Sequence, residues 1–220
     1  MRTIAIVGAG GVLGDALVRE FVSKGDYVIK LRRADSHTVD QFACALDQPE
    51  EVESCLREIA ARQPIDILIH NSAHLESSPF LKLTAESFEL TWRVCVGAAA
   101  AAARAVLPGM LRKQTGVIVF SGATASVRGS ENFAAFASAK FALRGLAQSL
   151  AREYQKRGIH VAHVIIDGLL HGSPSIQRFG GSEETALHPE SVAGVYRSIC
   201  DQTSDCWTHE LDLRPMVGRF

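Results

Sequence analysis

Residues 7–14 read VGAGGVLG, between a short apolar segment at 3–7 and residues that recur at helical spacing. Gly8 and Gly10 allow a tight turn and a close approach of backbone amides to a pyrophosphate, and Gly14 lets the helix pack on a sheet. A glycine-rich turn alone is a weak signal, and a merely structural turn is the alternative. Here it lies in the strand-turn-helix context that phosphate binding requires, so we expect a dinucleotide-binding βαβ unit.

The rest of the chain alternates in the same way between apolar strands and helices. Strands are expected at residues 27–31, 42–46, 65–70, 116–120, 159–166 and 207–211, and helices at 12–24, 49–62, 84–110, 133–157 and 189–200. Strands that are apolar throughout are typical of a parallel sheet covered on both faces. The pattern predicts one doubly wound, Rossmann-type α/β domain over residues 1–220.

Composition excludes several classes of function. The 220 residues carry a net charge of -1 without a block of like charges, so no nucleic-acid partner is expected. The five cysteines form no CxxC pair, which argues against a metal site and for reduced thiols in the cytoplasm. The apolar run 94–106 is shorter than the roughly 20 residues of a membrane span, so no membrane association is expected.

Six alanines at 98–103 favour close helix packing, within the chain or between subunits.

The end of the second predicted strand reads VIKLRRADSH, residues 28–37. Enzymes that prefer NAD place an acidic side chain there to bind the ribose 2′-hydroxyl. Leu31 has no such group, whereas Arg32 and Arg33 can bind a 2′-phosphate through charge-assisted hydrogen bonds. We therefore expect NADP(H) rather than NAD(H). Asp35 lies nearby in the sequence and argues for NAD(H). The alternative interpretation of Arg32 and Arg33 is two solvated arginines at the end of a strand.

Several segments, in this order, resemble the short-chain dehydrogenase/reductase family. After the glycine turn they are HNSA at 70–73, AVLPGM at 105–110, FASAKFALRGLAQSLARE from 136 and IIDG at 165–168. The resemblance implies a seven-stranded parallel sheet with helices on both faces and a small-molecule substrate. It also implies a homodimer or homotetramer formed through the two long helices.

The resemblance also assigns cofactor contacts. The residues implied are Gly8, Gly10, Gly11, Val12, Leu13, Gly14, Arg32, Arg33, Leu46, Asn71, Ser72, Ala73, Lys140, Gly168 and Leu170. The chain departs from the family at Val12, where the middle glycine is usual, and at Asp167, where proline is usual. Neither change removes a backbone N–H cradle, and we interpret Asp167 as the start of a turn.

The family's catalytic set is Asn, Ser, Tyr and Lys, and only the last is kept, as Lys140. The Tyr position holds Phe136, which has no proton to donate. The Ser position falls on Ala123 and the Asn position on Cys95. Among substitutes, Thr124 can orient a substrate oxygen but is a poor acid without a charged partner.

His74 and Cys95 are further candidate proton donors, since both can ionise. Residues 169–188 are polar and glycine-rich and are expected to form a mobile cover with a short helical piece. Three functions remain open: an atypical NADP(H)-dependent oxidoreductase, a non-redox catalyst such as an isomerase, cyclase or dehydratase, and an inactive NADP(H)-binding or regulatory subunit.

Overall fold

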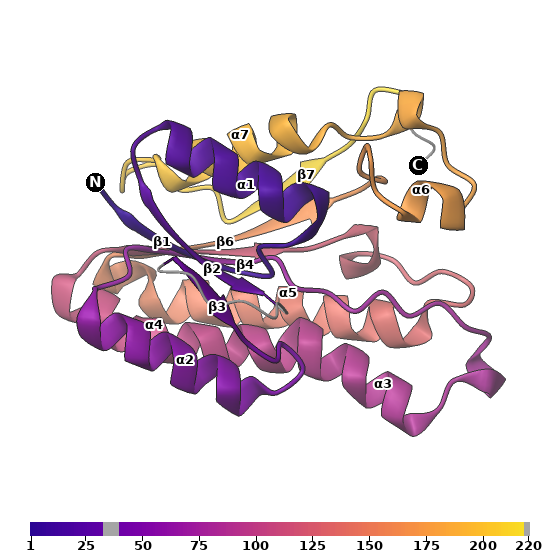
Figure 1. Ribbon diagram of the computed structural model, residues 1–220, viewed down its shortest axis with the longest axis horizontal. Helices are drawn as coiled ribbons and strands as arrows, with labels where there is room; N and C mark the ends of the chain where they lie inside the picture. Colours follow the sequence, from indigo (N-terminus) through magenta and orange to yellow (C-terminus); the bar gives the residue numbers. More distant parts are fainter. Residues whose placement is uncertain (33–39, 218–220) are drawn as a thin grey trace.

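Seven parallel strands form one sheet in the order β3-β2-β1-β4-β5-β6-β7 (Figure 1). The computed structural model describes residues 1–32 and 40–217. The strands are β1 (Thr3–Val7), β2 (Tyr27–Arg32), β3 (Gln41–Ala43), β4 (Ile67–His70), β5 (Gly116–Ser121), β6 (Ile159–Ile166) and β7 (Glu210–Leu213). The order reverses between β1 and β4, which creates the crevice where such sheets bind ligands. The predicted fold class is confirmed.

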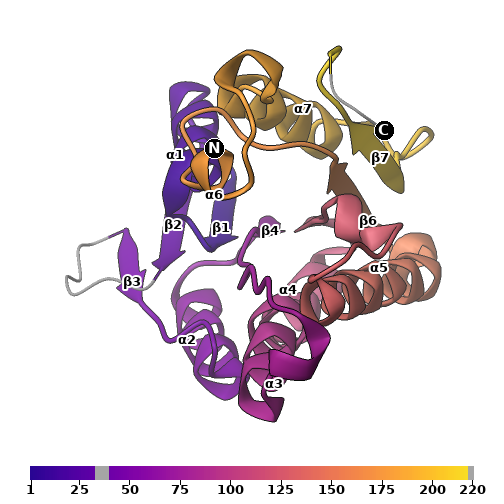
Figure 2. The same cartoon turned by 90° about the vertical axis from the view of Figure 1, so that its right-hand side faces the viewer.

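Helices cover both faces of the sheet (Figure 2). One face carries α1 (Gly11–Ser23) and α7 (Pro189–Cys200), and the other carries α2 (Pro49–Arg62), α4 (Ala98–Lys113) and α5 (Ala134–Tyr154). A separate hydrophobic cluster lies on each side of the sheet. Every residue of β1, β4 and β6 is buried, which explains why these strands are mostly apolar in sequence.

The helix predicted at 84–110 is not continuous. It consists of α3 (Ala85–Trp92), a π-helical turn (Arg93–Gly97) and α4. Cys95 lies inside the π turn and is fully buried. Such π turns often mark functional sites, and periodicity at 3.6 residues does not reveal them.

The two edge strands also differ from the prediction. β3 ends at Ala43, so Leu46 lies in the following loop, and β7 is shifted to Glu210–Leu213. Among the described residues each edge strand pairs on one side only, β3 through three residue pairs with β2. Because β3 pairs with β2 through so few residues, it ends earlier than the apolar pattern at 42–46 predicts.

Residues Ala85–Lys113 form a helical stretch of 29 residues whose length and hydropathy would suffice to cross a bilayer. In this fold 67% of its most apolar window is buried inside the protein. Five of the six alanines at 98–103 are buried, and α4 packs closely against α2. The alanine run therefore serves packing within the chain.

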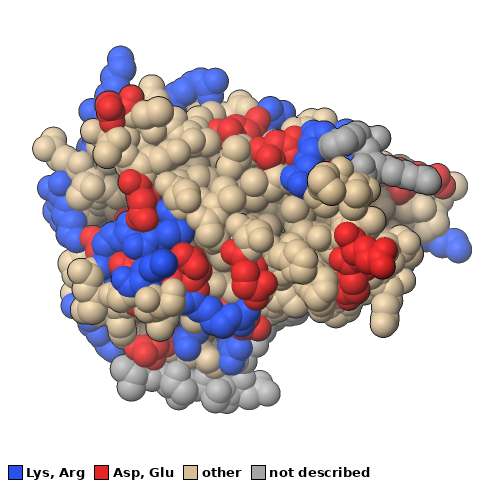
Figure 3. Space-filling view, turned by 90° about the horizontal axis from the view of Figure 1, so that it is seen from above, with Lys and Arg blue, Asp and Glu red and all other residues tan. Residues whose placement is uncertain are grey.

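Lys and Arg side chains lie beside Asp and Glu on the face that carries α1 and α7 (Figure 3). The best-connected group centres on Asp26, whose side chain is only 6% exposed. Its carboxylate pairs with Arg2 at 2.9 Å and with Arg197 at 2.6 Å, and both arginines also pair with Asp201. This network ties the start of β1 to α7.

Candidate functional site

A cavity of about 780 Å³ lies at the carboxyl ends of the strands, where the sheet order reverses. Its walls come from the turn after β1, the ends of β2 and β4, the loop after β3, and the start of the helix at 85–113. The lining residues are Gly8, Gly10, Gly11, Arg32, Leu46, Asp47, Asn71, Ser72, Ala73, His74, Leu90 and Val94. The structure therefore brings most of the predicted cofactor residues, together with His74, around one space.

The glycine turn fits a pyrophosphate. Gly8 has φ +85°, and a Cβ there would lie 2.6 Å from the backbone nitrogen of Ser72. A Cβ at Gly14 would lie 2.5 Å from the carbonyl carbon of Ala9, so this glycine lets α1 pack closely. At Gly10, by contrast, a Cβ would meet nothing within 4 Å, and no side chain among the described residues caps α1. Unpaired N–H groups at a helix start attract phosphate.

Arg32 is the last residue of β2 and lines the cavity. Its Nε is buried and has no hydrogen-bond partner among the described residues. Arg33 lies outside the described residues. Asp47 lines the same cavity and was missed from the sequence, although it directly follows the predicted Leu46.

A chain of hydrogen bonds runs beneath the cavity. The Asn71 amide donates to the carbonyl oxygen of Gly8 at 3.0 Å, and the Ser121 hydroxyl donates to Asn71 Oδ1 at 3.0 Å. The Tyr196 hydroxyl lies 2.7 Å from Ser121 Oγ and donates to it, because Ser121 has already used its single hydrogen. Burial raises the pKa of Tyr196, so it stays neutral. No sequence signal distinguishes Tyr196 from the other core residues of α7.

Lys140 and Phe136 lie one turn apart on the same face of α5. Lys140 is 2% exposed, and its Nζ donates to the carbonyl oxygen of Ser121 at 2.7 Å. Burial lowers the pKa of Lys140. Its Nζ lies 5.6 Å from the centre of the Phe136 ring. The lysine is thus held at the end of β5 with an aromatic ring, rather than a hydroxyl, beside it.

Two further ionisable side chains are buried near Lys140. His70 ends β4, and both of its ring nitrogens lack a hydrogen-bond partner among the described residues. Burial, together with the charge of Lys140, lowers the pKa of His70 to about 3, so its ring is neutral. Cys95 belongs to the same hydrophobic cluster as Phe136 and does not line the cavity. This burial separates Cys95 from any ligand held there.

Thr124 and Asp167 meet at the carboxyl edge of the sheet. The Thr124 hydroxyl donates to Asp167 Oδ1, and the other carboxylate oxygen lies 3.2 Å from Arg214 Nε. Thr124 thus has a carboxylate partner, and Asp167 contacts both Thr124 and Arg214. Because β5 and β6 are adjacent and parallel, the residues that follow them converge. The two residues are 43 positions apart, so local patterns do not reveal the contact.

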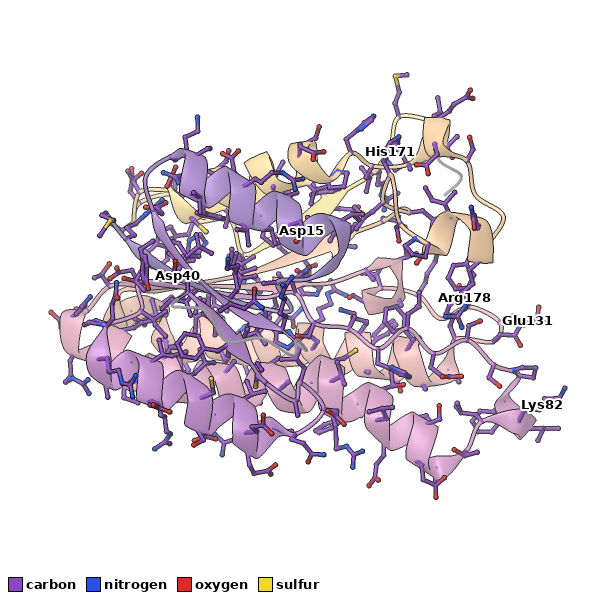
Figure 4. All side chains as sticks on the ribbon, in the orientation of Figure 1. Asp15, Asp40, Lys82, Glu131, His171 and Arg178 are labelled. Carbon is purple, nitrogen blue, oxygen red and sulfur yellow. The ribbon has the colours of Figure 1, made fainter. Side chains whose placement is uncertain are left out.

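The segment 169–188 contains a short helix, α6 (Ser175–Arg178), as predicted. Figure 4 labels Arg178 on this helix and His171 near the start of the segment. Arg178 donates to the carbonyl oxygen of Leu75, and the Phe179 ring lies 5.5 Å from that of Phe133. These contacts place α6 beside the loops that follow β4 and precede α5.

Other residues of the predicted site and of the segment 169–188 do not line the cavity. His171 stacks on His188 with 4.8 Å between ring centres. Leu170 forms an isolated bridge with Leu187, and a Cβ at Gly168 would lie 3.1 Å from Pro215. Leu13 is buried in the core. The cofactor contacts assigned to Val12, Leu13, Gly168 and Leu170 stay predictions. His74 pairs weakly with Glu76, with 3.6 Å between Nε2 and Oε2.

Comparisons with known proteins agree on the family. A family model described as short chain dehydrogenase matches residues 2–170. The crystal structure of a short-chain dehydrogenase from Rhodopseudomonas palustris is 33% identical, with a TM-score of 0.82 over 97% of this chain and 98% of that chain. A metagenomic short-chain oxidoreductase in complex with NADP shares the fold at 20% identity, with a TM-score of 0.84 over 99% of this chain and 98% of that one.

Curated relatives are more distant. Peroxisomal multifunctional enzyme A of Dictyostelium discoideum is 28% identical over 179 residues, which is 72% of this chain and 41% of that protein. The match therefore spans less than half of that relative.

Proposed function

The chain belongs to the short chain dehydrogenase family, and we propose that it is an NADP(H)-dependent oxidoreductase acting on a small organic molecule. The observation that carries the proposal is the glycine cradle: Gly10 borders the cavity, and a Cβ there would meet nothing within 4 Å. The uncapped start of α1 supplies N–H groups for a pyrophosphate at the same place.

The preference for NADP(H) rests on Arg32. Arg32 borders the cavity at the end of β2, where a 2′-phosphate would be bound. A buried Nε without a described partner is a donor that such a phosphate would satisfy. Bound NADP(H) would supply or accept hydride. Lys140 would hold the ribose beside the nicotinamide, as the family resemblance implies.

The proposed active site is non-standard. Phe136, Ala123 and Cys95 stand where the family resemblance implies Tyr, Ser and Asn. Phe136 and Ala123 pack within one hydrophobic cluster, so this part of the site is apolar. Thr124 directly follows Ala123, and its hydroxyl could contact a substrate oxygen. His74 is the candidate proton donor that lies in the cavity wall.

A non-redox catalyst is the second candidate, because Phe136 replaces the usual proton donor while the buried Lys140 is kept. The experiment that separates the two candidates is a cofactor titration followed by turnover assays on matched alcohols and ketones. We expect NADPH to bind and to exchange hydride with at least one compound, and Gly10→Ala to lose both properties while remaining folded. Product formation in cofactor-stripped protein, without oxidation of NADPH, would favour the second candidate.

We infer that the assembly is a homodimer or homotetramer formed through α4 and α5. Phe141 on α5 is 44% exposed, and Trp92 at the end of α3 is 45% exposed. Large apolar side chains on the surface of such helices suit an interface between copies. Light scattering of wild type and Phe141→Lys tests the assignment, since a monomeric wild-type protein would contradict it.

A further inference from the structure

The hydrogen bond between Thr124 and Asp167 determines whether the Thr124 hydroxyl can donate or accept a further hydrogen bond. This hydroxyl lies at the edge of the sheet where the substrate is expected. Thr124 begins a short 3-10 helix (Thr124–Ser126) that follows β5, and Asp167 directly follows β6. Three residues before Thr124, the carbonyl of Ser121 accepts from Lys140. Thr124 therefore lies close in sequence to the carbonyl that anchors Lys140, and its bond to Asp167 joins the ends of two neighbouring strands.

A threonine hydroxyl carries one hydrogen and two lone pairs, whereas an ionised carboxylate only accepts. In this structure the hydrogen of Thr124 is donated to Asp167 Oδ1. No described group donates to Thr124 Oγ1, and the residue is half-buried. Toward a ligand, Thr124 therefore offers an acceptor and has no hydrogen left to donate.

Asp167 shares its cationic neighbour with a second carboxylate. Its second oxygen pairs with Arg214 at 3.2 Å, and its side chain is only 12% exposed. Arg214 also pairs with Asp212, at 2.5 Å. The free lone pairs of Thr124 suit a hydrogen-bond donor, and in a pair of matched alcohol and ketone only the alcohol offers one, through its hydroxyl.

We propose that Thr124, held by Asp167, is a specificity-determining contact that accepts a hydrogen bond from a substrate hydroxyl. The site then binds the alcohol form of a substrate more tightly than the carbonyl form. The family resemblance implies the opposite polarity at this edge, with Tyr and Ser donating to the substrate oxygen. The inference rests on the proposed function only in taking this edge as the substrate site.

The test compares cyclohexanol with cyclohexanone as probes, by ligand-detected NMR titration of the full chain with and without NADP⁺. Wild type is expected to bind the alcohol about threefold to tenfold more tightly, the range of one net hydrogen bond. Thr124→Val should abolish this preference, and Thr124→Ser should keep it. Asp167→Asn should shift the preference toward the ketone, because an amide can donate to Thr124 and release its hydrogen.

Asp212→Asn is the matched control, since Asp212 also pairs with Arg214 but does not contact Thr124. Thermal unfolding of each variant shows whether it is folded, and Thr124→Ala, which also lacks the hydroxyl, tests the loss of preference if Thr124→Val is not. Equal binding of the two probes by wild type, or identical preferences in Asp167→Asn and Asp212→Asn, would overturn the proposal. Failure of NADPH to exchange hydride would instead count against the proposed function, because probe binding is read without turnover.

Discussion

Replacing Gly8 by alanine should destabilise the fold. At φ +85° a side chain costs about 1–2 kcal/mol, because this region is crowded for L-residues. The new Cβ would also lie 2.6 Å from the backbone nitrogen of Ser72, and overpacking of this kind costs about 1–3 kcal/mol. Together these give roughly 2–5 kcal/mol, or a fall in Tm of roughly 4–20 °C for a domain of this size.

Gly10→Ala is the matched control in the same turn. Gly10 has φ -102° and ψ 172°, a backbone conformation open to any residue, and its Cβ would meet nothing within 4 Å. Its stability cost should stay below about 1 kcal/mol. The added methyl group would project into the cavity, so NADPH affinity should fall by about tenfold or more.

Differential scanning calorimetry and NADPH titration measure both effects. The account predicts that Gly8→Ala loses stability, whereas Gly10→Ala loses affinity at nearly unchanged Tm. A Gly8→Ala protein that melts with wild type would refute the steric argument. A Gly10→Ala protein that binds NADPH like wild type would refute the position assigned to the pyrophosphate.

Two further predictions concern charge and the missing hydroxyl. Burial alone would raise the pKa of Asp26, but Arg2 and Arg197 outweigh it and the pKa is lowered. Asp26→Asn should therefore lower the free energy of unfolding by about 1.5–3 kcal/mol at pH 7, and urea denaturation should show this difference shrinking as pH falls through about 4, where a constant difference would contradict it. Phe136→Tyr should raise the rate of ketone reduction roughly tenfold. This gain is smaller than the roughly 10²–10⁴-fold rate enhancement of a well-placed general acid, because Ala123 and Cys95 still stand at the Ser and Asn positions. Phe141→Tyr, on the exposed side of α5, is the control, and equal rates in the two variants would contradict the role given to Phe136.

Much of the fold follows from patterns that are local in sequence. β1, α2, β6 and α7 have the expected bounds, because each combines a continuous apolar or amphipathic pattern with clear stop signals. The glycine turn was equally informative, since its chemistry depends on backbone N–H groups rather than on distant contacts. The π turn in the long helix was not foreseen, because one extra residue in a helical turn leaves the overall apolar character unchanged.

The site was predicted less completely because its contacts join distant segments. Asp167 and Tyr196 acquire partners only when the sheet brings β5, β6 and α7 together. A sequence shows that Asp167 follows a strand but not which hydroxyl it will meet. Asp47 could have been found, since it stands in the loop after an expected strand, next to Leu46.

The most direct test of the account compares the affinities of NADPH and NADH by calorimetric titration. Arg32 is assigned to the 2′-phosphate, and a charge-assisted hydrogen bond contributes about 1.5–3 kcal/mol, so wild type should bind NADPH roughly tenfold to a hundredfold more tightly. Arg32→Ala should remove this difference, whereas Lys30→Ala, two residues earlier on β2 and outside the cavity wall, should keep it. Equal affinities in wild type, or no binding of either dinucleotide, would contradict the central claim.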